Sequence, residues 1–245
     1  MLPYRDDNPA ILTPFVTLGV IALNVAAWVL VQGAGVEPAL ARSVCELGLI
    51  PGELLHLLPI GASVPVGEGI SCTLGTANTW YTPLTSMFLH GSWGHILGNM
   101  WFFWVFGNNV EDAMGHSRFL AFYLLCGLAA AGAQVLAAPD SAIPMVGASG
   151  AISGIMGAYI MLYPRVRVHM ITLLVIFPFT FTLPAYLLLG YWFLLQILGG
   201  SLAPGDSGGV AFWAHTGGFL AGALLIRLFQ KPELMVRHQM LRMSE

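Results

Sequence analysis

Residues 147–163 read Gly-Ala-Ser-Gly-Ala-Ile-Ser-Gly-Ile-Met-Gly-Ala-Tyr-Ile-Met-Leu-Tyr, an apolar run that contains no charged side chain. Glycines at positions 150, 154 and 157 fall on one face of a helix, because residues three and four apart are neighbours on a helix surface. Faces of small residues let transmembrane helices pack closely. The run therefore predicts a short membrane-spanning helix, near 148–163, whose glycine face contacts a neighbouring helix.

Similar apolar runs dominate the rest of the chain. Of its 245 residues, 57% are hydrophobic and 9% are charged, whereas soluble domains average about 25% charged residues. Runs of about 17–25 apolar residues can cross a bilayer. They occur near 13–34, 93–111, 117–138, 148–163, 169–190 and 210–230. We therefore predict an all-α polytopic membrane protein with six transmembrane helices in one domain over 1–232, followed by a short cytoplasmic tail over 233–245.

The fifth apolar run is the least regular. Pro178 and Pro184 interrupt it, and its apolar character continues to Leu198. Because proline breaks the hydrogen bonding of a helix, we expect a kink there or an extension that lies at the membrane interface. The ends of this span are expected to differ by several residues from 169–190.

The positive charges predict the orientation in the membrane. Eight of the nine Lys and Arg residues fall at the N-terminus, in the second and fourth connections or after the last run, and only Arg42 falls on the other side. The positive-inside rule then puts both termini in the cytoplasm and the long 35–92 loop outside. The first run is long enough to span and has no cleavage site, so we expect it to be retained. Without a transit peptide, the sequence fits a multi-pass protein of a bacterial-type plasma (inner) membrane, and it leaves an organelle membrane open as the alternative. The net charge of -3 does not suggest a nucleic-acid partner.

Three cysteines are too few for a disulfide framework. Cys126 falls inside an apolar run, where we expect it to pack. Cys45 and Cys72 both fall in the 35–92 loop. In an oxidising outer compartment these two residues can pair, whereas two free or separately buried thiols fit the sequence equally well.

Polar side chains at membrane depth are costly and need a partner or a function. Four such residues stand near the outer ends of predicted spans: His95, Asn99, Ser149 and His215. Ser149 opens the fourth span beside glycines, and His215 shares a helix face with Gly218 and Gly222. If the two glycine faces pack together, a ring nitrogen of His215 reaches the Ser149 hydroxyl.

These residue types fit nucleophilic catalysis. A serine needs a base to take its proton, and histidine suits this task because imidazole titrates near neutral pH. His95 and Asn99 lie at i and i+4 on one helix, so with the Ser149 backbone N–H they can donate hydrogen bonds to the oxyanion of a peptide-hydrolysis intermediate. No acidic residue is obviously placed to orient His215. We therefore predict a Ser149–His215 dyad that needs no cofactor and no metal.

Three motifs carry a family resemblance. They are His90-Gly91-Ser92-Trp93-Gly94-His95-Ile96-Leu97-Gly98-Asn99-Met100, Gly147-Ala148-Ser149-Gly150, and Ala214-His215-Thr216-Gly217-Gly218 with Gly222. In their order, spacing and position, the chain resembles the rhomboid intramembrane serine proteases from its first span to its sixth. The resemblance implies that Ser149 is the nucleophile and His215 the general base and acid. It implies oxyanion-hole roles for His95 and Asn99, and a structural role for His90.

Two positions depart from the family pattern. The family's outer loop often carries a Trp-Arg pair before the first motif, but here the stretch is Trp80-Tyr81-Thr82. In well-known members an aromatic residue one turn after the serine stacks on the catalytic histidine, but here that residue is Ser153. The resemblance therefore does not predict what orients His215.

The sequence thus predicts an intramembrane serine endopeptidase whose partners are the transmembrane segments of substrate proteins and the lipid bilayer. Its site would open toward the outer, periplasmic side. The alternative is a catalytically inactive relative that binds clients, although such a protein is expected to lack Ser149 or His215. A metal or proton transporter built on His90, His95 and His215 is disfavoured, because we expect no carboxylate within the spans to pair with them.

Overall fold

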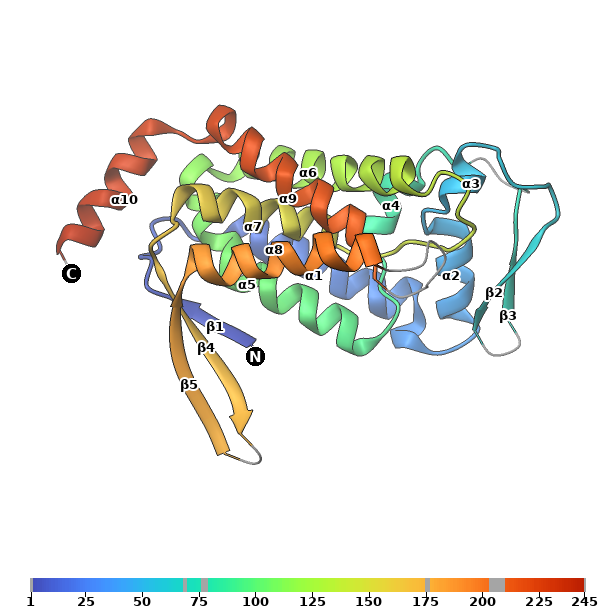
Figure 1. The fold of residues 1–245 in the computed structure, drawn as a ribbon, viewed down its shortest axis with the longest axis horizontal. Coiled ribbons are helices and arrows are strands. Elements are labelled where there is room, and N and C mark those ends of the chain that lie inside the picture. Colours follow the sequence, from blue (N-terminus) through green and yellow to red (C-terminus); the bar gives the residue numbers. More distant parts are fainter. Residues whose placement is uncertain (1, 68–69, 76–78, 175–176, 203–209, 245) are drawn as a thin grey trace.

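The computed structural model describes residues 2–244 except 68–69, 76–78, 175–176 and 203–209. Its main body is a bundle of helices that run along the long axis of the molecule (Figure 1). The bundle helices are α1 (Phe15–Ala26), continued by η1 (Ala27–Val31), α5 (Trp93–Met114), α6 (His116–Ala137), α7 (Ser149–Leu162), α8 (Ala185–Leu202) and α9 (Phe212–Phe229). We call the end of the bundle where α7 begins the site end, and the opposite end, where both chain termini lie, the termini end (Figure 1).

The predicted fold class, a polytopic helical membrane bundle, is confirmed. Among the described residues, α6, α8 and α9 are long and apolar enough to cross a membrane, and residues 15–31 and α7 form shorter apolar helices. The surface of the bundle is apolar as well, since Leu30, Leu136 and Leu224 are 81%, 84% and 74% exposed. Leucine side chains on a protein surface are stable when lipid, and not water, surrounds them.

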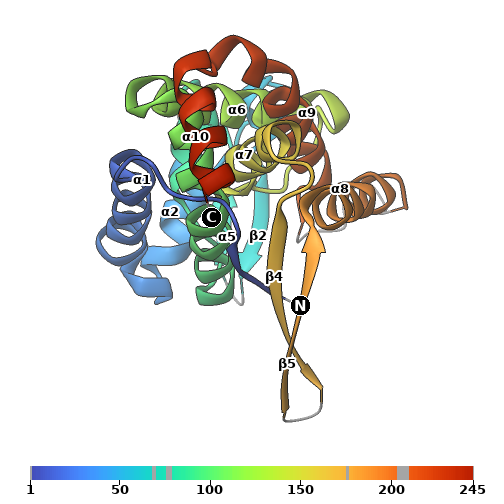
Figure 2. The same ribbon diagram turned by 90° about the vertical axis from the view of Figure 1, so that its left-hand side faces the viewer.

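Helix α7 is the buried centre of the bundle, with α6 and α9 packed against it (Figure 2). A side-chain carbon on Gly222 of α9 would collide with the carbonyl oxygen of Gly154, and one on Gly218 would collide with that of Gly150. Only glycine, whose side chain is a hydrogen atom, allows the two helix backbones to come this close. The predicted pairing of two glycine faces is therefore confirmed, and it brings the first turns of α7 and α9 together.

The predicted span over 169–190 is wrong. The described residues of this stretch begin with two antiparallel strands, β4 (Arg167–Leu174) and β5 (Phe177–Pro184), and α8 begins only at Ala185. Strand β1 (Leu2–Asp6) pairs with β4, so the strand order is β1-β4-β5. The β4–β5 hairpin leaves the bundle at its termini end (Figures 1 and 2).

The physical reason for the error is the period of the apolar pattern. Three phenylalanines at positions 177, 179 and 181 alternate with Pro178 and Thr180, and an alternation of two is the pattern of a strand. A sum of hydrophobicity over a window does not register this period. Pro178 and Pro184 also disfavour the interior of a helix, because proline has no N–H to donate.

Two carboxylates at the end of α5 fasten the N-terminal segment. Asp112 accepts hydrogen bonds from the backbone N–H groups of Ile11 (2.7 Å) and Leu12 (2.8 Å). Glu111 accepts from those of Val16 (2.9 Å) and Thr17 (2.8 Å), which have no partner within the first turn of α1. Both carboxylates lie within α5, but at the termini end, far along the helix from His95.

The loop over 35–92 forms short elements at the site end. With the turn before it, these are η2 (Gly33–Gly35), α2 (Ala39–Leu47), α3 (Pro51–Leu54), β2 (Ser63–Gly67), β3 (Ile70–Thr73), α4 (Thr82–Thr85) and η3 (Ser86–Phe88). A disulfide joins Cys45 on α2 to Cys72 on β3. Of the two alternatives that the sequence leaves open, the structure has the pair. Cys126 is a buried free thiol, as expected.

The stretch without the family's arginine is held by other groups. The Thr85 hydroxyl donates to the carbonyl oxygen of Leu47 at 2.7 Å, and the Tyr81 hydroxyl donates to that of Glu46 at 3.3 Å. Both acceptors are among the last carbonyl groups of α2, which lack helical partners. Together with the disulfide, these contacts bind the end of the loop to α2.

The predicted tail over 233–245 falls in helix α10 (Pro232–Ser244). The His238 side chain is buried, and its ring stacks on Tyr163 at a centroid distance of 4.9 Å. The Lys231 N–H donates to the carbonyl oxygen of Ala113 at 2.8 Å just before α10 begins. The tail is therefore attached to the termini end of the bundle, where α10 crosses in front of α5 (Figure 2).

Candidate active site

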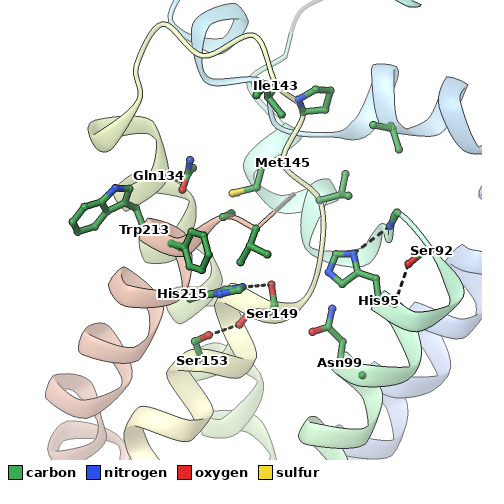
Figure 3. A pocket seen from close by; sticks show the side chains of 18 of the residues that line it. Ser92, His95, Asn99, Gln134, Ile143, Met145, Ser149, Ser153, Trp213 and His215 are labelled. Atoms are coloured by element: carbon green, nitrogen blue, oxygen red, sulfur yellow. Dashed lines mark hydrogen bonds between the residues drawn. The ribbon is translucent and has the colours of Figure 1, made fainter. Parts of the chain in front are cut away.

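Ser149 and His215 meet at the site end of the bundle. Ser149 is the first residue of α7, and His215 lies in the first turn of α9. The Nε2 atom of His215 is 2.8 Å from Oγ of Ser149, a hydrogen-bonding distance (Figure 3). Both side chains are partly exposed. The close packing of the glycine faces of α7 and α9 therefore brings Ser149 and His215 into hydrogen-bonding contact, as the sequence predicts.

A residue that the sequence analysis missed contacts the other side of the imidazole ring. The Nδ1 atom of His215 is 2.8 Å from Oε1 of Gln196 on α8, a buried side chain. The amide nitrogen of Gln196 donates to the carbonyl oxygen of Trp192 at 3.3 Å, which fixes the amide with its oxygen toward His215. Because that oxygen only accepts, Nδ1 carries the proton and Nε2 is left to accept from the Ser149 hydroxyl.

Helix α8 also supplies the aromatic neighbour of His215. The Trp192 ring lies 5.7 Å from the His215 ring between centroids, at an interplanar angle of 38°. Ser153, which stands at the family's aromatic position, is fully buried and donates its hydroxyl to the carbonyl oxygen of Ser149 at 2.6 Å. The aromatic contact is therefore made from another helix, and Ser153 ties the first turn of α7 to itself.

A sequence signal for Gln196 exists. Gln196 is a polar residue inside the apolar stretch 185–202, and the rule that singled out His95 and Asn99 applies to it equally. It was missed because the predicted fifth span ended at 190. The correct position of α8 brings Gln196 level with the first turn of α9.

His95 lies on α5, across from Ser149 (Figure 3). Its Nδ1 atom accepts a hydrogen bond from the Gly91 N–H at 3.3 Å, so in the neutral ring Nε2 carries the proton. A side-chain carbon on Gly147 would lie 2.7 Å from this Nε2 atom, and Gly147 has a φ angle of 130°. Glycine is required there by both the backbone and the approach of the ring. The ring Nε2–H of His95 is therefore directed at the start of α7.

Asn99 stands one turn further along α5. It is 8% exposed and lines the same cavity as Ser149 (Figure 3). Within the described part of the chain, its amide nitrogen is a buried donor with no hydrogen-bond partner. Buried polar groups are rarely left unpaired, so this donor is available for a group that enters the cavity.

His90 occupies a different environment from the other histidines. Its ring is fully buried and meets the His95 ring edge-on at 5.1 Å between centroids. Its backbone N–H donates to Oε1 of Gln32 at 2.7 Å, and its carbonyl oxygen accepts from Nε2 of Gln32 at 2.8 Å. His90 therefore links the start of α5 to the end of the first helix, which agrees with its expected structural role.

The polar residues face a cavity of about 880 Å³ at the site end. Its walls come from α2, α5, α6, α7, α8, the connection over 141–146 and the start of α9. They include Ser149, His215, His95, Asn99 and Trp192. The volume is within the usual range of ligand pockets, about 300–1,000 Å³. Within the described ranges, no group of three or more His, Cys, Asp or Glu side chains is arranged to hold a metal ion.

Comparison with known proteins identifies the family of this chain. The Rhomboid domain model matches residues 77–232. The chain is 37% identical over 76 residues to Rhomboid-like protein 11, chloroplastic, of Arabidopsis thaliana (31% of this chain, 27% of the relative). Two further relatives are from Bacillus subtilis (strain 168). The chain is 38% identical over 79 residues to Rhomboid protease GluP, which is 32% of this chain and 15% of the relative. It is 34% identical over 88 residues to Putative rhomboid protease YdcA, which is 36% of this chain and 44% of the relative. These matches span less than half the length of each relative. The chain is an integral membrane protein of the rhomboid family.

Proposed function

We propose that this protein is an intramembrane serine endopeptidase that cuts other membrane proteins in or beside their transmembrane segments. The observation that carries the proposal is the 2.8 Å contact between His215 Nε2 and Ser149 Oγ. A serine hydroxyl is a weak nucleophile unless a base within hydrogen-bond reach takes its proton. The similarity to Rhomboid protease GluP and to Putative rhomboid protease YdcA supports the same activity.

In the proposed reaction, His215 takes the proton of Ser149 as Oγ attacks the carbonyl carbon of the substrate's peptide bond. His215 then gives this proton to the leaving amine, which leaves an acyl group on Ser149. Water that enters the cavity then loses a proton to His215 as its oxygen attacks the acyl carbon. The bond from this carbon to Oγ breaks, the acyl group leaves as a carboxylic acid, and His215 returns the proton to Oγ of Ser149. Gln196 keeps the imidazole in the tautomer that the first step needs.

The carbonyl oxygen of the substrate becomes negative in the tetrahedral intermediate. The candidate donors to it are the unpartnered amide nitrogen of Asn99, the Nε2–H of His95 and the backbone N–H of Ser149. The Ser149 N–H lies at the start of α7, where N–H groups lack helical partners and the helix dipole favours negative charge. These groups form the oxyanion hole of the proposed enzyme.

The proposed substrates are the transmembrane segments of client proteins, because the helices around the cavity present an apolar surface to lipid. A regular helix hides its carbonyl groups, so the expected clients have a locally unstable helix and small residues at the cut. In the proposed topology, the termini end faces the cytoplasm and the cavity opens on the outer side of a plasma (inner) membrane.

Labelling with a fluorophosphonate probe, which reacts with activated serines, tests the catalytic proposal. Wild type in detergent is expected to label, and Ser149→Ala and His215→Ala are expected to lose the label. Ser92→Ala is a matched control, because Ser92 also lines the cavity but caps α5 through the His95 N–H. If folded wild type stays unlabelled, or if Ser149→Ala labels as wild type does, the dyad is wrong and an inactive client-binding protein becomes the better account.

A further inference from the structure

The β4–β5 hairpin is an apolar projection that the proposed reaction does not use. It extends sideways from the termini end, across the long axis of the bundle, and stands clear of the helices in both views (Figures 1 and 2). Near its tip, Phe177 is 72% exposed and Phe179 is 49% exposed. A long apolar edge strand in water is prone to pair with other chains, so this surface needs a partner.

The hairpin has two chemically different faces. Residues directly opposite each other in an antiparallel pair share a face. Phe181 is opposite Met170, and Leu183 is opposite Val168, so the three phenylalanines of β5 lie on the same face as Val168 and Met170. The opposite face carries Pro178, Thr180 and Thr182 of β5 and, from β4, His169 and the apolar Ile171. We call these the aromatic face and the threonine face.

The aromatic face continues the core of the bundle. Val168 and Met170 are buried in the main hydrophobic core, and Phe181 packs against that core. Farther from the bundle, the same face becomes exposed at Phe179 and Phe177. The face that points toward the helices at the base of the hairpin is thus the face that stays apolar to the tip.

Charge is distributed to match a membrane surface. Residues 170–184 contain no charged side chain, whereas Arg5, Arg165 and Arg167 are exposed at the base of the hairpin, together with one exposed acidic residue, Asp7, which binds His169. Arg167 is opposite Pro184, and Arg5 is opposite His169, so both arginines belong to the threonine face. An apolar face combined with a basic polar side is the composition of elements that lie in a membrane interface beside anionic lipids.

The direction of the hairpin relative to the bundle helices indicates that the membrane covers its aromatic face. Because the helices cross the membrane along the long axis, an element that runs across this axis at one end lies along the membrane surface. Its aromatic face is on the side of the helices, which is the side of the bilayer. We infer that the aromatic face of the β4–β5 hairpin inserts into the lipid leaflet at the termini end, with the arginines at its base at headgroup level.

This docking has a consequence for the site. Strand β5 ends at Pro184 and α8 begins at Ala185, so no linker separates the hairpin from the helix that carries Trp192 and Gln196. A hairpin held by lipid fixes the start of α8 relative to the membrane. The lipid contact itself follows from the membrane fold and stands whether or not the protein is a protease.

The depth of a fluorophore on each face tests the inference. Phe177→Cys and Thr180→Cys are each labelled with an environment-sensitive dye in the full chain, which has only a buried thiol and a disulfide otherwise. The proteins are placed singly in nanodiscs of phosphatidylcholine and phosphatidylglycerol. At position 177 we expect roughly threefold less quenching by aqueous iodide than at 180, and stronger quenching by lipids with a nitroxide on the acyl chain.

Two outcomes overturn the inference. Equal iodide quenching at both positions, without an effect of the lipid nitroxide, means that the hairpin stands in water. Protection of position 177 that appears only when two copies share a nanodisc means that the aromatic face pairs with a second copy instead of lipid. Neither reading uses catalytic activity, so a failed protease proposal leaves the measurement interpretable.

Discussion

The amide oxygen of Gln196 lies 2.8 Å from Nδ1 of His215, on the side of the imidazole that faces away from Ser149. In a serine protease triad, a carboxylate in this place selects the tautomer of the histidine and stabilises its positive charge. A glutamine oxygen selects the tautomer without supplying a charge. Gln196 is therefore a positioning residue of the proposed site.

Replacement of Gln196 tests this role. Gln196→Leu keeps the volume but removes the acceptor, so Nδ1 no longer favours its proton and we expect the maximal rate of fluorophosphonate labelling to fall about 10-fold. Gln196→Glu retains an acceptor and is expected to retain most of the rate. The half-saturating probe concentration should stay unchanged in both variants, because Gln196 does not border the bound probe. A shift in that concentration with an unchanged maximal rate would contradict a positioning role.

Asn99 is expected to act on the rate of the chemical step. Asn99→Leu keeps an approximately similar volume and removes the donor, so cleavage of a transmembrane substrate should slow about 100-fold, the usual effect of losing one oxyanion-hole donor. Asn108→Leu, on the same helix but near the termini end, serves as the control for general effects of the substitution. Normal turnover in Asn99→Leu would remove Asn99 from the oxyanion hole.

Trp192 and Ser153 should differ in their effects. Trp192→Ala removes the ring beside His215, so the imidazole becomes less confined and labelling should slow several-fold. Ser153→Ala loses only a hydroxyl bond to the Ser149 carbonyl oxygen, so its labelling rate should stay within about twofold of wild type. Parallel labelling time courses measure both. Equal losses would mean that Ser153 has taken over the role of the family's aromatic residue.

The glycine contact between α7 and α9 predicts a stability difference. Gly222→Ala places a methyl group against the carbonyl oxygen of Gly154, which should cost about 1–3 kcal/mol in free energy of unfolding and separate Ser149 from His215. Gly132→Ala on α6 is the matched control, because nothing lies within 4 Å of the added carbon. Thermal unfolding in detergent compares the two. An unchanged midpoint for Gly222→Ala would show that the helices pack less closely than described.

The disulfide predicts the reactivity of the thiols. In wild type under denaturing conditions, only Cys126 should react with an alkylating reagent until a reductant is added, after which mass spectrometry should show two further adducts. Because the bond joins residues with a sequence separation of 27, its loss should destabilise the loop over 35–92 by about 3–4 kcal/mol in the chain-entropy model. Proteolysis of the loop in Cys72→Ser checks this. Alkylation of all three cysteines without reductant would show that the pair is not formed.

Much of this protein follows from its sequence alone. The lengths of apolar runs determine which segments reside in lipid, since lipid cannot satisfy polar groups. The spacing of Gly150, Gly154 and Gly157 determines a helix face, and small residues on it dictate close packing. Ser149 and His215 stand out because a polar group at membrane depth is costly. These conclusions need only the local order of apolar, small and polar residues and the fact that lipid is the solvent.

The tertiary structure alone decided how distant segments meet. The alternation of Phe177, Phe179 and Phe181 marks a strand locally, but the pairing of β5 with β4 and of β4 with β1, and with it the late start of α8, appears only in the tertiary structure. The position of α8 brings Gln196 and Trp192 to His215. Pairing of Cys45 with Cys72 likewise depends on the distance between two loop elements. Each of these contacts joins residues far apart in the chain, and a local pattern of composition and period does not specify such a contact.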